Sequence, residues 1–129
     1  MGSVNNYRIL RYADVLLMYA EALNELNQTA SAFQYINQVR TRAGLPDLSG
    51  LSQDNLRLAI ERERRVEFLH EGHRWFDLLR TGKAIEVMNA QKDGQGNNLN
   101  YDVQPYQLIF PIPQTQIDLN PFLIQNPSY

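Results

Sequence analysis

The sequence contains no cysteine, which excludes disulfides, thiolate metal ligands and cysteine nucleophiles. It also lacks an excess of charge of either sign, because its formal net charge at pH 7 is −2. So small a net charge argues against nucleic acid as a partner. No apolar run approaches the ~20 residues that a membrane-spanning helix needs. Hydrophobic residues make up 43% and charged residues 20%, as expected of a soluble globular protein.

The first three residues, Met1-Gly2-Ser3, have neither the cationic nor the apolar segment of a signal peptide. We expect residues 1–3 to be a cloning remnant and residues 4–129 to be one helical domain from a larger protein. The natural N-terminus would then precede this sequence, together with any export signal or lipid anchor. A chain of 129 residues suits a single hydrophobic core.

Apolar residues recur at helical spacing over residues 9–26 and predict the first helix. They occupy two faces and leave only a narrow polar stripe, so this helix is expected to pack on two sides. A second helix is expected over residues 30–43, ended by Gly44 and Pro46. Because the connection at 27–29 is short, the two helices should be antiparallel.

A third helix should begin after Ser52, which is a good N-cap, and run to about His70. Shorter helices are expected over residues 73–80 and 83–90, separated by Gly82. The asparagine- and glycine-rich residues 91–105 are typical of a loop.

Residues 106–112 could form a short strand, but Pro111 and Pro113 limit them to an edge or an extended segment. The last residues should be irregular, and they are apolar enough that we expect them to dock on the helices. The predicted fold is therefore all-α, with antiparallel helix pairs and an irregular, loop-rich C-terminal segment. One pair of about the ~34-residue tetratricopeptide length is present, without a clear second copy, so an ordinary αα-hairpin remains an alternative.

Four ordered blocks of the sequence resemble the C-terminal region of the SusD/RagB family. They are RYADVLLMYAEALNE at 11–25, INQVRTRAGLP at 36–46, ERRVEFLHEGHRWFDLLRTGK at 63–83 and FPIPQTQIDLNPFLIQNPSY at 110–129. The blocks together extend over nearly the whole chain.

This resemblance implies an α-helical, tetratricopeptide-like scaffold in a lipid-anchored protein exposed on the bacterial outer membrane. Such proteins cap a SusC-like TonB-dependent transporter, bind oligosaccharides or in some members peptides, and break no bonds. The resemblance implies no cofactor. It also implies that most ligand residues lie upstream of the region seen here, so no ligand motif can be carried over to these positions.

Two groups of ionisable residues are candidates for chemistry. His70 and His73 are three residues apart with Gly72 between them, which does not match the four-residue spacing of a zinc helix. No metal site is therefore expected. Glu61 and Arg65 are four residues apart and are expected to form a structural ion pair rather than part of an acid–base site.

Two sets of residues that include aromatic rings are candidates for sugar binding. Trp75 is the only tryptophan, and with Phe76 it lies in an apolar segment, so core packing is the preferred role over stacking on a sugar. In the loop and just after it, four residues combine amide and phenol groups and form the candidate ligand-binding set: Asn97, Asn98, Tyr101 and Tyr106.

These observations favour a non-catalytic binding module that captures oligosaccharides, with peptide capture as a variant. The alternative is a purely structural or protein-interacting helical segment, in which all ligand contacts belong to the rest of the parent. In either case the apolar first helix predicts a surface left uncovered in this chain, and self-association is a possible consequence.

Overall fold

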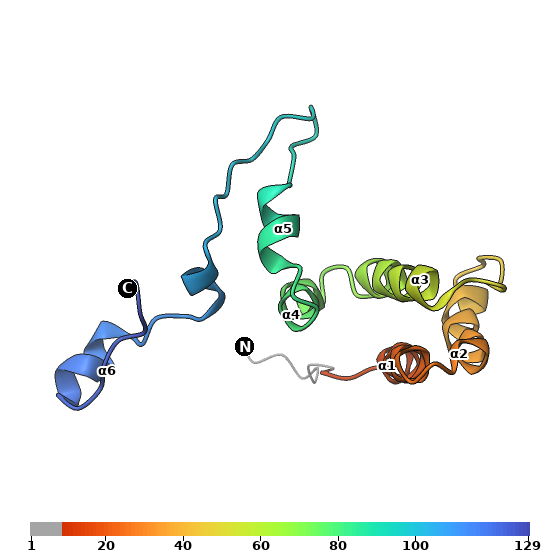
Figure 1. Ribbon diagram of the computed structural model, residues 1–129, viewed down its shortest axis with the longest axis horizontal. Coiled ribbons are helices and arrows are strands. Elements are labelled where there is room, and N and C mark those ends of the chain that lie inside the picture. Colours follow the sequence, from red (N-terminus) through yellow and green to blue (C-terminus); the bar gives the residue numbers. More distant parts are fainter. Residues whose placement is uncertain (1–8) are drawn as a thin grey trace, which may run out of the picture. The chain divides into compact units, whose positions relative to one another are not determined.

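The structure is a computed structural model, and it describes residues 9–129. Within that range the chain is helical, without a strand (Figure 1). It divides into two compact units, one ending at His73 and the other formed by Arg74–Tyr129. The proposed cloning remnant at residues 1–3 lies outside the described range. The elements are α1 Tyr12–Glu25, α2 Thr29–Arg42, α3 Gln53–Glu67, α4 His73–Arg80, α5 Ala84–Asn89, the 3₁₀ helix η1 Pro105–Leu108 and α6 Gln114–Leu119.

The core of the first unit is built by α1, α2 and α3, and α1 packs on both of the other helices. Each helix contributes aliphatic side chains at helical spacing, and Phe68 closes one end. Removing this surface from water is the main stabilising term for the unit. The buried core residues are Leu16, Leu17, Ala20, Leu23, Ala32, Ile36, Val39, Leu56, Ile60 and Phe68.

The helix ends follow the predicted capping signals. The Ser52 hydroxyl accepts a hydrogen bond from the Asn55 backbone N–H at 3.3 Å, which confirms it as the N-cap of α3. Gly44 has a φ of +72°, and the backbone N–H of Leu45 donates to the Arg40 carbonyl at 2.9 Å. That bond and the left-handed glycine are the features of a Schellman motif, so α2 ends where the sequence predicted.

Asn24 joins the three helices through a buried amide. Its Nδ2 donates to the Gln53 carbonyl at 2.9 Å, and its Oδ1 accepts from the Thr29 hydroxyl at 2.9 Å. The Gln53 side chain in turn donates to the Asn24 carbonyl. A buried amide with its partners satisfied fixes the relative position of the helix ends, because losing a partner would leave a buried polar group unpaired.

The second unit is held together largely by side chains that bind the backbone. The Gln125 amide both donates to the carbonyl and accepts from the N–H of Ile112, at 2.9 and 2.8 Å. Asn126 donates to the Phe110 carbonyl, and the Tyr129 hydroxyl donates to the Ile109 carbonyl, both at 2.8 Å. These bonds tie the last residues of the chain to the extended segment at 109–112.

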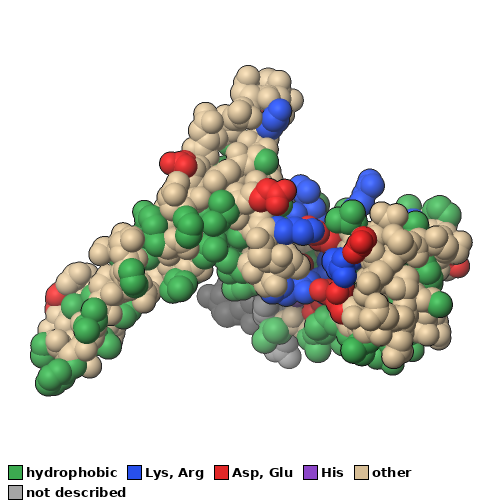
Figure 2. Space-filling model, in the orientation of Figure 1, with side chains coloured by type: hydrophobic (Ala, Val, Ile, Leu, Met, Phe, Trp, Pro, Cys, Tyr) green, Lys and Arg blue, Asp and Glu red, His purple; other side chains and the backbone are tan. Residues whose placement is uncertain are grey.

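The C-terminal segment differs from the prediction in its helices. Residues 114–119 form α6 and residues 105–108 form η1, neither of which was predicted, whereas the residues after η1 are extended, one of the two forms expected there. Within this segment Phe122 is 90% exposed and Ile124 is 87% exposed, and the docking expected for the tail stays a prediction. Figure 2 shows hydrophobic side chains over this segment with few charged ones among them.

The second apolar face of α1 is also uncovered. The side chains at this face are partly or largely exposed, although the Tyr19 ring packs edge-on against Tyr35 at a centroid distance of 4.5 Å. Within the described residues α1 packs on α2 and α3, but its second apolar face stays exposed. The exposed positions are Tyr12, Val15, Met18, Tyr19 and Ala22.

Candidate functional site

The candidate loop begins with a turn organised by Asp93. Its Oδ1 accepts from the backbone N–H groups of Gln95 and Asn97 at 2.9 and 2.8 Å, and its Oδ2 accepts from the Asn97 amide at 2.9 Å. These hydrogen bonds favour the carboxylate, the bond from the Asn97 side chain most strongly, and they hold the pKa of Asp93 below its usual range. The turn therefore keeps its shape at neutral pH.

The turn is closed by backbone bonds between its two sides. Lys92 and Asn98 form an isolated antiparallel bridge, and the Leu99 N–H donates to the Gln91 carbonyl at 3.0 Å. Asn97 belongs to the inner hydrogen bonds of this turn, so its Nδ2 already has a protein acceptor. Asn98 is exposed beside it, and within residues 9–129 no hydrogen bond is recorded for its side-chain amide.

Tyr101 lies on a strained and exposed part of the loop. The flanking residues Asn100 and Asp102 have φ values of +52° and +48°, a conformation that asparagine and aspartate tolerate better than other non-glycine residues. Val103, which follows Asp102, is held by the side chain of Asn89. The Asn89 Nδ2 donates to the Val103 carbonyl at 3.1 Å, and the Asn89 Oδ1 accepts from the Val103 N–H at 2.6 Å. The Tyr101 ring is thereby presented from an anchored backbone, with 53% of the residue exposed.

Tyr106 lies on η1 and packs edge-on against Tyr129 at a centroid distance of 5.1 Å. Because the Tyr129 hydroxyl is bonded to the Ile109 carbonyl, the ring beside Tyr106 is held in place. The structure therefore places two of the four candidates, Asn97 and Tyr106, in local structural contacts. All four candidates are exposed, but Asn98 and Tyr101 are the two whose side chains make no hydrogen bond or ring contact within residues 9–129.

Trp75 and Phe76 lie on α4 with different burial. Trp75 is half-buried and Phe76 is largely exposed. The buried side chains of this helix are Asp77 and Leu78, and the Arg80 Nε donates to Asp77 at 2.8 Å. The structural role predicted for Trp75 and Phe76 stays a prediction.

The charged residues of α3 form ion pairs with α1 and α2. Arg64 donates to Asp14 at 2.7 Å, with the side chains only 6% and 8% exposed. Arg40 donates to Glu63 at 2.8 Å. Glu61 is half-buried and Arg65 is exposed, and the pair predicted between them stays a prediction.

Arg11 binds two carboxylates and a backbone carbonyl of the first unit. It binds the Glu71 carboxylate through two nitrogens at 2.9 and 2.7 Å, and Glu67 through its carboxylate at 2.8 Å and its carbonyl at 3.0 Å. Its guanidinium also lies over the Phe68 ring, 4.9 Å from the centroid. Its hydrogen bonds lower the pKa of Glu71. Paired carboxylates of this kind stay ionised and are poorly suited to act as general acids.

The two histidines do not form a metal centre in the part of the chain that is described. His70 is exposed with a φ of +74°, and the His73 ring packs on Phe68 at 4.8 Å. Within residues 9–129 no group of three or more potential ligands is close enough to hold a metal ion.

The sequence model of the SusD family matches residues 1–129. The chain belongs to the SusD family. The resemblance read from the four sequence blocks is thereby confirmed. A SusD-like protein of Formosa agariphila is 40% identical over 126 residues, which cover 95% of this chain and 24% of that protein. A second SusD-like protein of the same organism is 41% identical over 133 residues, which cover 96% and 25%.

Solved SusD-family structures share the helical fold. A SusD superfamily protein from Bacteroides vulgatus matches with a TM-score of 0.80 and 34% identity, over 95% of this chain and 27% of that one. A SusD-like carbohydrate binding protein from Bacteroides fragilis matches with a TM-score of 0.72 and 32% identity, over 87% and 27%. The all-α, tetratricopeptide-like fold is confirmed, and this SusD-family chain spans about a quarter of the length of its relatives.

Several residues that shape the candidate loop were missed from the sequence. Asn89 and Tyr129 each act through a contact with a distant part of the second unit, whereas Asp93 binds residues two and four positions away. The clustering of Asp93 with glycine and asparagine signalled a turn, but nothing local marks Asn89 or Tyr129 as its supports. None of the helices in residues 9–129 has the length and apolar character needed to cross a membrane.

Proposed function

We propose that this chain is a non-catalytic part of a SusD-family protein that captures oligosaccharides at the bacterial surface for a SusC-like TonB-dependent transporter. The match of the family over residues 1–129 carries the proposal. A relative described as a carbohydrate binding protein supports sugar as the ligand class. The longer parent would be held at the outer membrane by a lipid anchor outside this sequence.

Within the chain, we propose that Asn98 and Tyr101 make contact with the sugar. An amide offers both a donor and an acceptor to vicinal hydroxyls, and an exposed phenol ring offers a face for C–H groups. Asp93 and Asn89 hold the backbone on either side of these residues. Tyr106 and Asn97 complete the proposed set, with their geometry fixed by the local contacts described above.

Two of the carboxylates, Glu25 and Glu71, are ion-paired in a way that does not suit cleavage. Glycoside hydrolysis needs two carboxyl groups, one of which has a raised pKa so that it can donate a proton. Hydrogen bonds from arginine instead lower the pKa of Glu71 and of Glu25. Binding with no bond broken is therefore the proposed activity, without a cofactor.

A second candidate function is that of a helical segment that contacts only protein. The exposed apolar face of α1 favours this alternative, because such a face is costly to leave in water. Peptide rather than glycan capture is a further variant of the first proposal. Both alternatives predict that sugars do not engage Asn98 or Tyr101.

Retardation in native gels that contain soluble polysaccharides tests the proposal. The chain is expected to migrate more slowly in at least one of a panel of glucan, mannan, xylan and galactan gels. Tyr101→Ala should lose at least about half of that retardation, because one packed aromatic ring contributes ~1 kcal/mol, as it does in aromatic pairs. The polysaccharide recovered from the gel should keep its original length.

Tyr12→Ala is the matched control, since Tyr12 is an exposed tyrosine on α1 outside the loop. It is expected to migrate as the unmodified chain does. Retardation that is lost equally in both variants would contradict the role of Tyr101. Migration unaffected by every polysaccharide would favour the protein-contacting alternative.

A further inference from the structure

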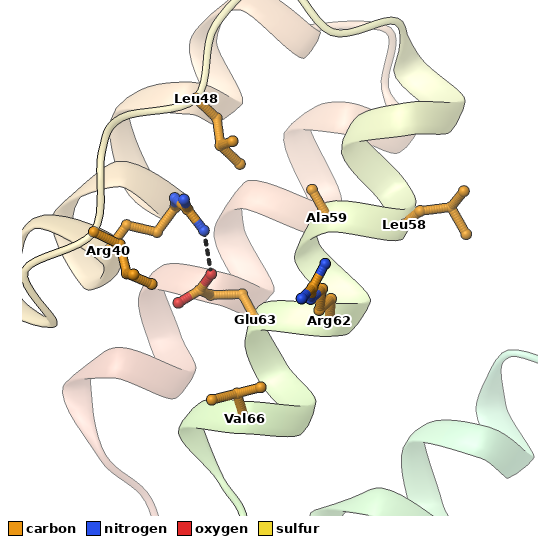
Figure 3. A pocket seen from close by; sticks show the side chains of 8 residues that line it. Arg40, Leu48, Leu58, Ala59, Arg62, Glu63 and Val66 are labelled. Carbon is orange, nitrogen blue, oxygen red and sulfur yellow. Dashed lines mark hydrogen bonds and ion pairs between the residues drawn. The ribbon is translucent and has the colours of Figure 1, made fainter.

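A groove lies on the outer side of α3, within the first unit. It encloses about 570 Å³ between α3, the end of α2 and the loop that joins them. Figure 3 shows Arg40 reaching from α2 to Glu63 on α3, with Leu48 on the loop facing the same opening. The lining residues are Arg40, Leu45, Leu48, Leu58, Ala59, Arg62, Glu63 and Val66.

One wall of the groove is a ridge on α3. Leu58, Arg62 and Val66 follow one another at four-residue spacing and are exposed, while Leu56 and Ile60 of the same helix are buried in the core. At 1.5 Å per residue this ridge is ~12 Å long. That length matches about four residues of an extended peptide at ~3.3 Å each.

The opposite wall is fixed before any ligand binds. The Asn37 amide donates to the Leu48 carbonyl and accepts from its N–H, at 3.0 and 2.9 Å. Arg40 donates to the Pro46 carbonyl at 3.0 Å and to Glu63 at 2.8 Å. A wall held by such bonds loses little conformational freedom on binding, which favours association.

The groove carries one positive charge that has no partner within residues 9–129. Arg40 and Glu63 neutralise each other across the floor. Arg62 is exposed, and no hydrogen bond or ion pair is recorded for its guanidinium in the described residues. Guanidinium groups bind carboxylates through two parallel hydrogen bonds, so an acidic group is the complementary partner.

The residue types that line the groove suit a peptide better than a sugar. None of the eight residues is aromatic, so no ring is available to stack on a sugar. Four of them are leucine or valine, which suit aliphatic side chains. We propose that this groove binds an extended segment of a partner protein in which a carboxylate is flanked by aliphatic side chains. This is a second site, separate from the proposed sugar contact and for another class of ligand.

The probe is the blocked peptide acetyl-Gly-Leu-Asp-Leu-Gly-amide, titrated into the isotope-labelled chain and followed by amide-resolved NMR. Saturable shifts are expected at residues 45–48 and 58–66, with an affinity of about 1 mM, as is usual for a short flexible peptide. The matched peptide with Asn in place of Asp should bind about fivefold more weakly, because the charged contact is lost.

Arg62→Gln should weaken the binding of the Asp peptide about fivefold, so that its affinity equals that of the Asn peptide. Arg65→Gln is the control, because Arg65 is exposed on the same helix but does not line the groove. It should leave the affinity unchanged. The proposal is overturned if no shift saturates by 10 mM peptide, about tenfold above the expected affinity, if the two peptides bind equally, or if maltohexaose and not the peptide moves these residues.

Discussion

Replacing Asp14 by alanine is expected to lower the free energy of unfolding by ~3–5 kcal/mol, the range for breaking one partner of a buried ion pair. Asp14 on α1 accepts from Arg64 on α3 at 2.7 Å, and both side chains are more than nine-tenths buried. Alanine would leave the guanidinium buried without this carboxylate. Urea denaturation followed by circular dichroism measures the effect.

Glu25→Ala is the matched control for Asp14→Ala. It removes a carboxylate that also joins α1 to α3, through Arg57 at 2.7 Å, but this pair is exposed. The expected loss is below ~1 kcal/mol, because water already solvates both charges. Equal losses in the two variants would show that burial of the Asp14 pair does not determine its contribution.

Leu17→Ala is expected to lower the free energy of unfolding by ~2–5 kcal/mol, through lost apolar burial and the cavity left behind. The adjacent Met18→Ala should cost less than ~1 kcal/mol. Leu17 is 0% exposed between α1 and its partner helices, whereas Met18 is 44% exposed on the second apolar face. Thermal or urea unfolding of the two variants compares the two faces of one helix directly.

The comparison also tests whether the second apolar face of α1 is buried in solution. If Met18→Ala proves as destabilising as Leu17→Ala, the outer face of α1 is buried in the protein in solution. Self-association would be the simplest cause, and sedimentation of the unmodified chain would then detect it. The account predicts that the large loss is confined to Leu17.

The helices of the first unit were predictable because their signals are local. Ser52 and Gly44 mark the start of α3 and the end of α2, and the structure confirms both positions. The start of α1 was placed three residues too early. Arg11 precedes α1 with extended backbone, and its side chain reaches Glu67 and Glu71, which are more than fifty residues away. Periodicity alone carries no information about such a contact.

The second unit was less predictable because amide groups rather than an apolar core organise it. Asn89 and Gln125 each pair with the backbone of a residue more than twelve positions away. Asparagine and glutamine side chains at the surface give the same sequence signal whether they bind backbone or water. The apolar residues of the tail suggested burial, yet Phe122 and Ile124 are exposed. The whole chain matches only 27% of a longer SusD superfamily protein.

The candidate loop was predictable as a loop but not as a defined surface. Residue type alone makes Asn97, Asn98, Tyr101 and Tyr106 candidates. Only the structure separates Asn97 and Tyr106, which local contacts hold, from the other two. The two left-handed residues that flank Tyr101 are asparagine and aspartate, which is compatible with a turn but does not predict its direction.

An amide-resolved NMR titration of the labelled chain with a panel of oligosaccharides tests the central claim most directly. The account predicts saturable shifts on residues 93–106, strongest at Asn98 and Tyr101, with α1–α3 unmoved and each oligosaccharide recovered intact. A spectrum that no oligosaccharide changes would contradict the claim that this part of the SusD-family protein touches the sugar. Oligosaccharides shortened during the titration would contradict the claim that the chain binds without cleaving.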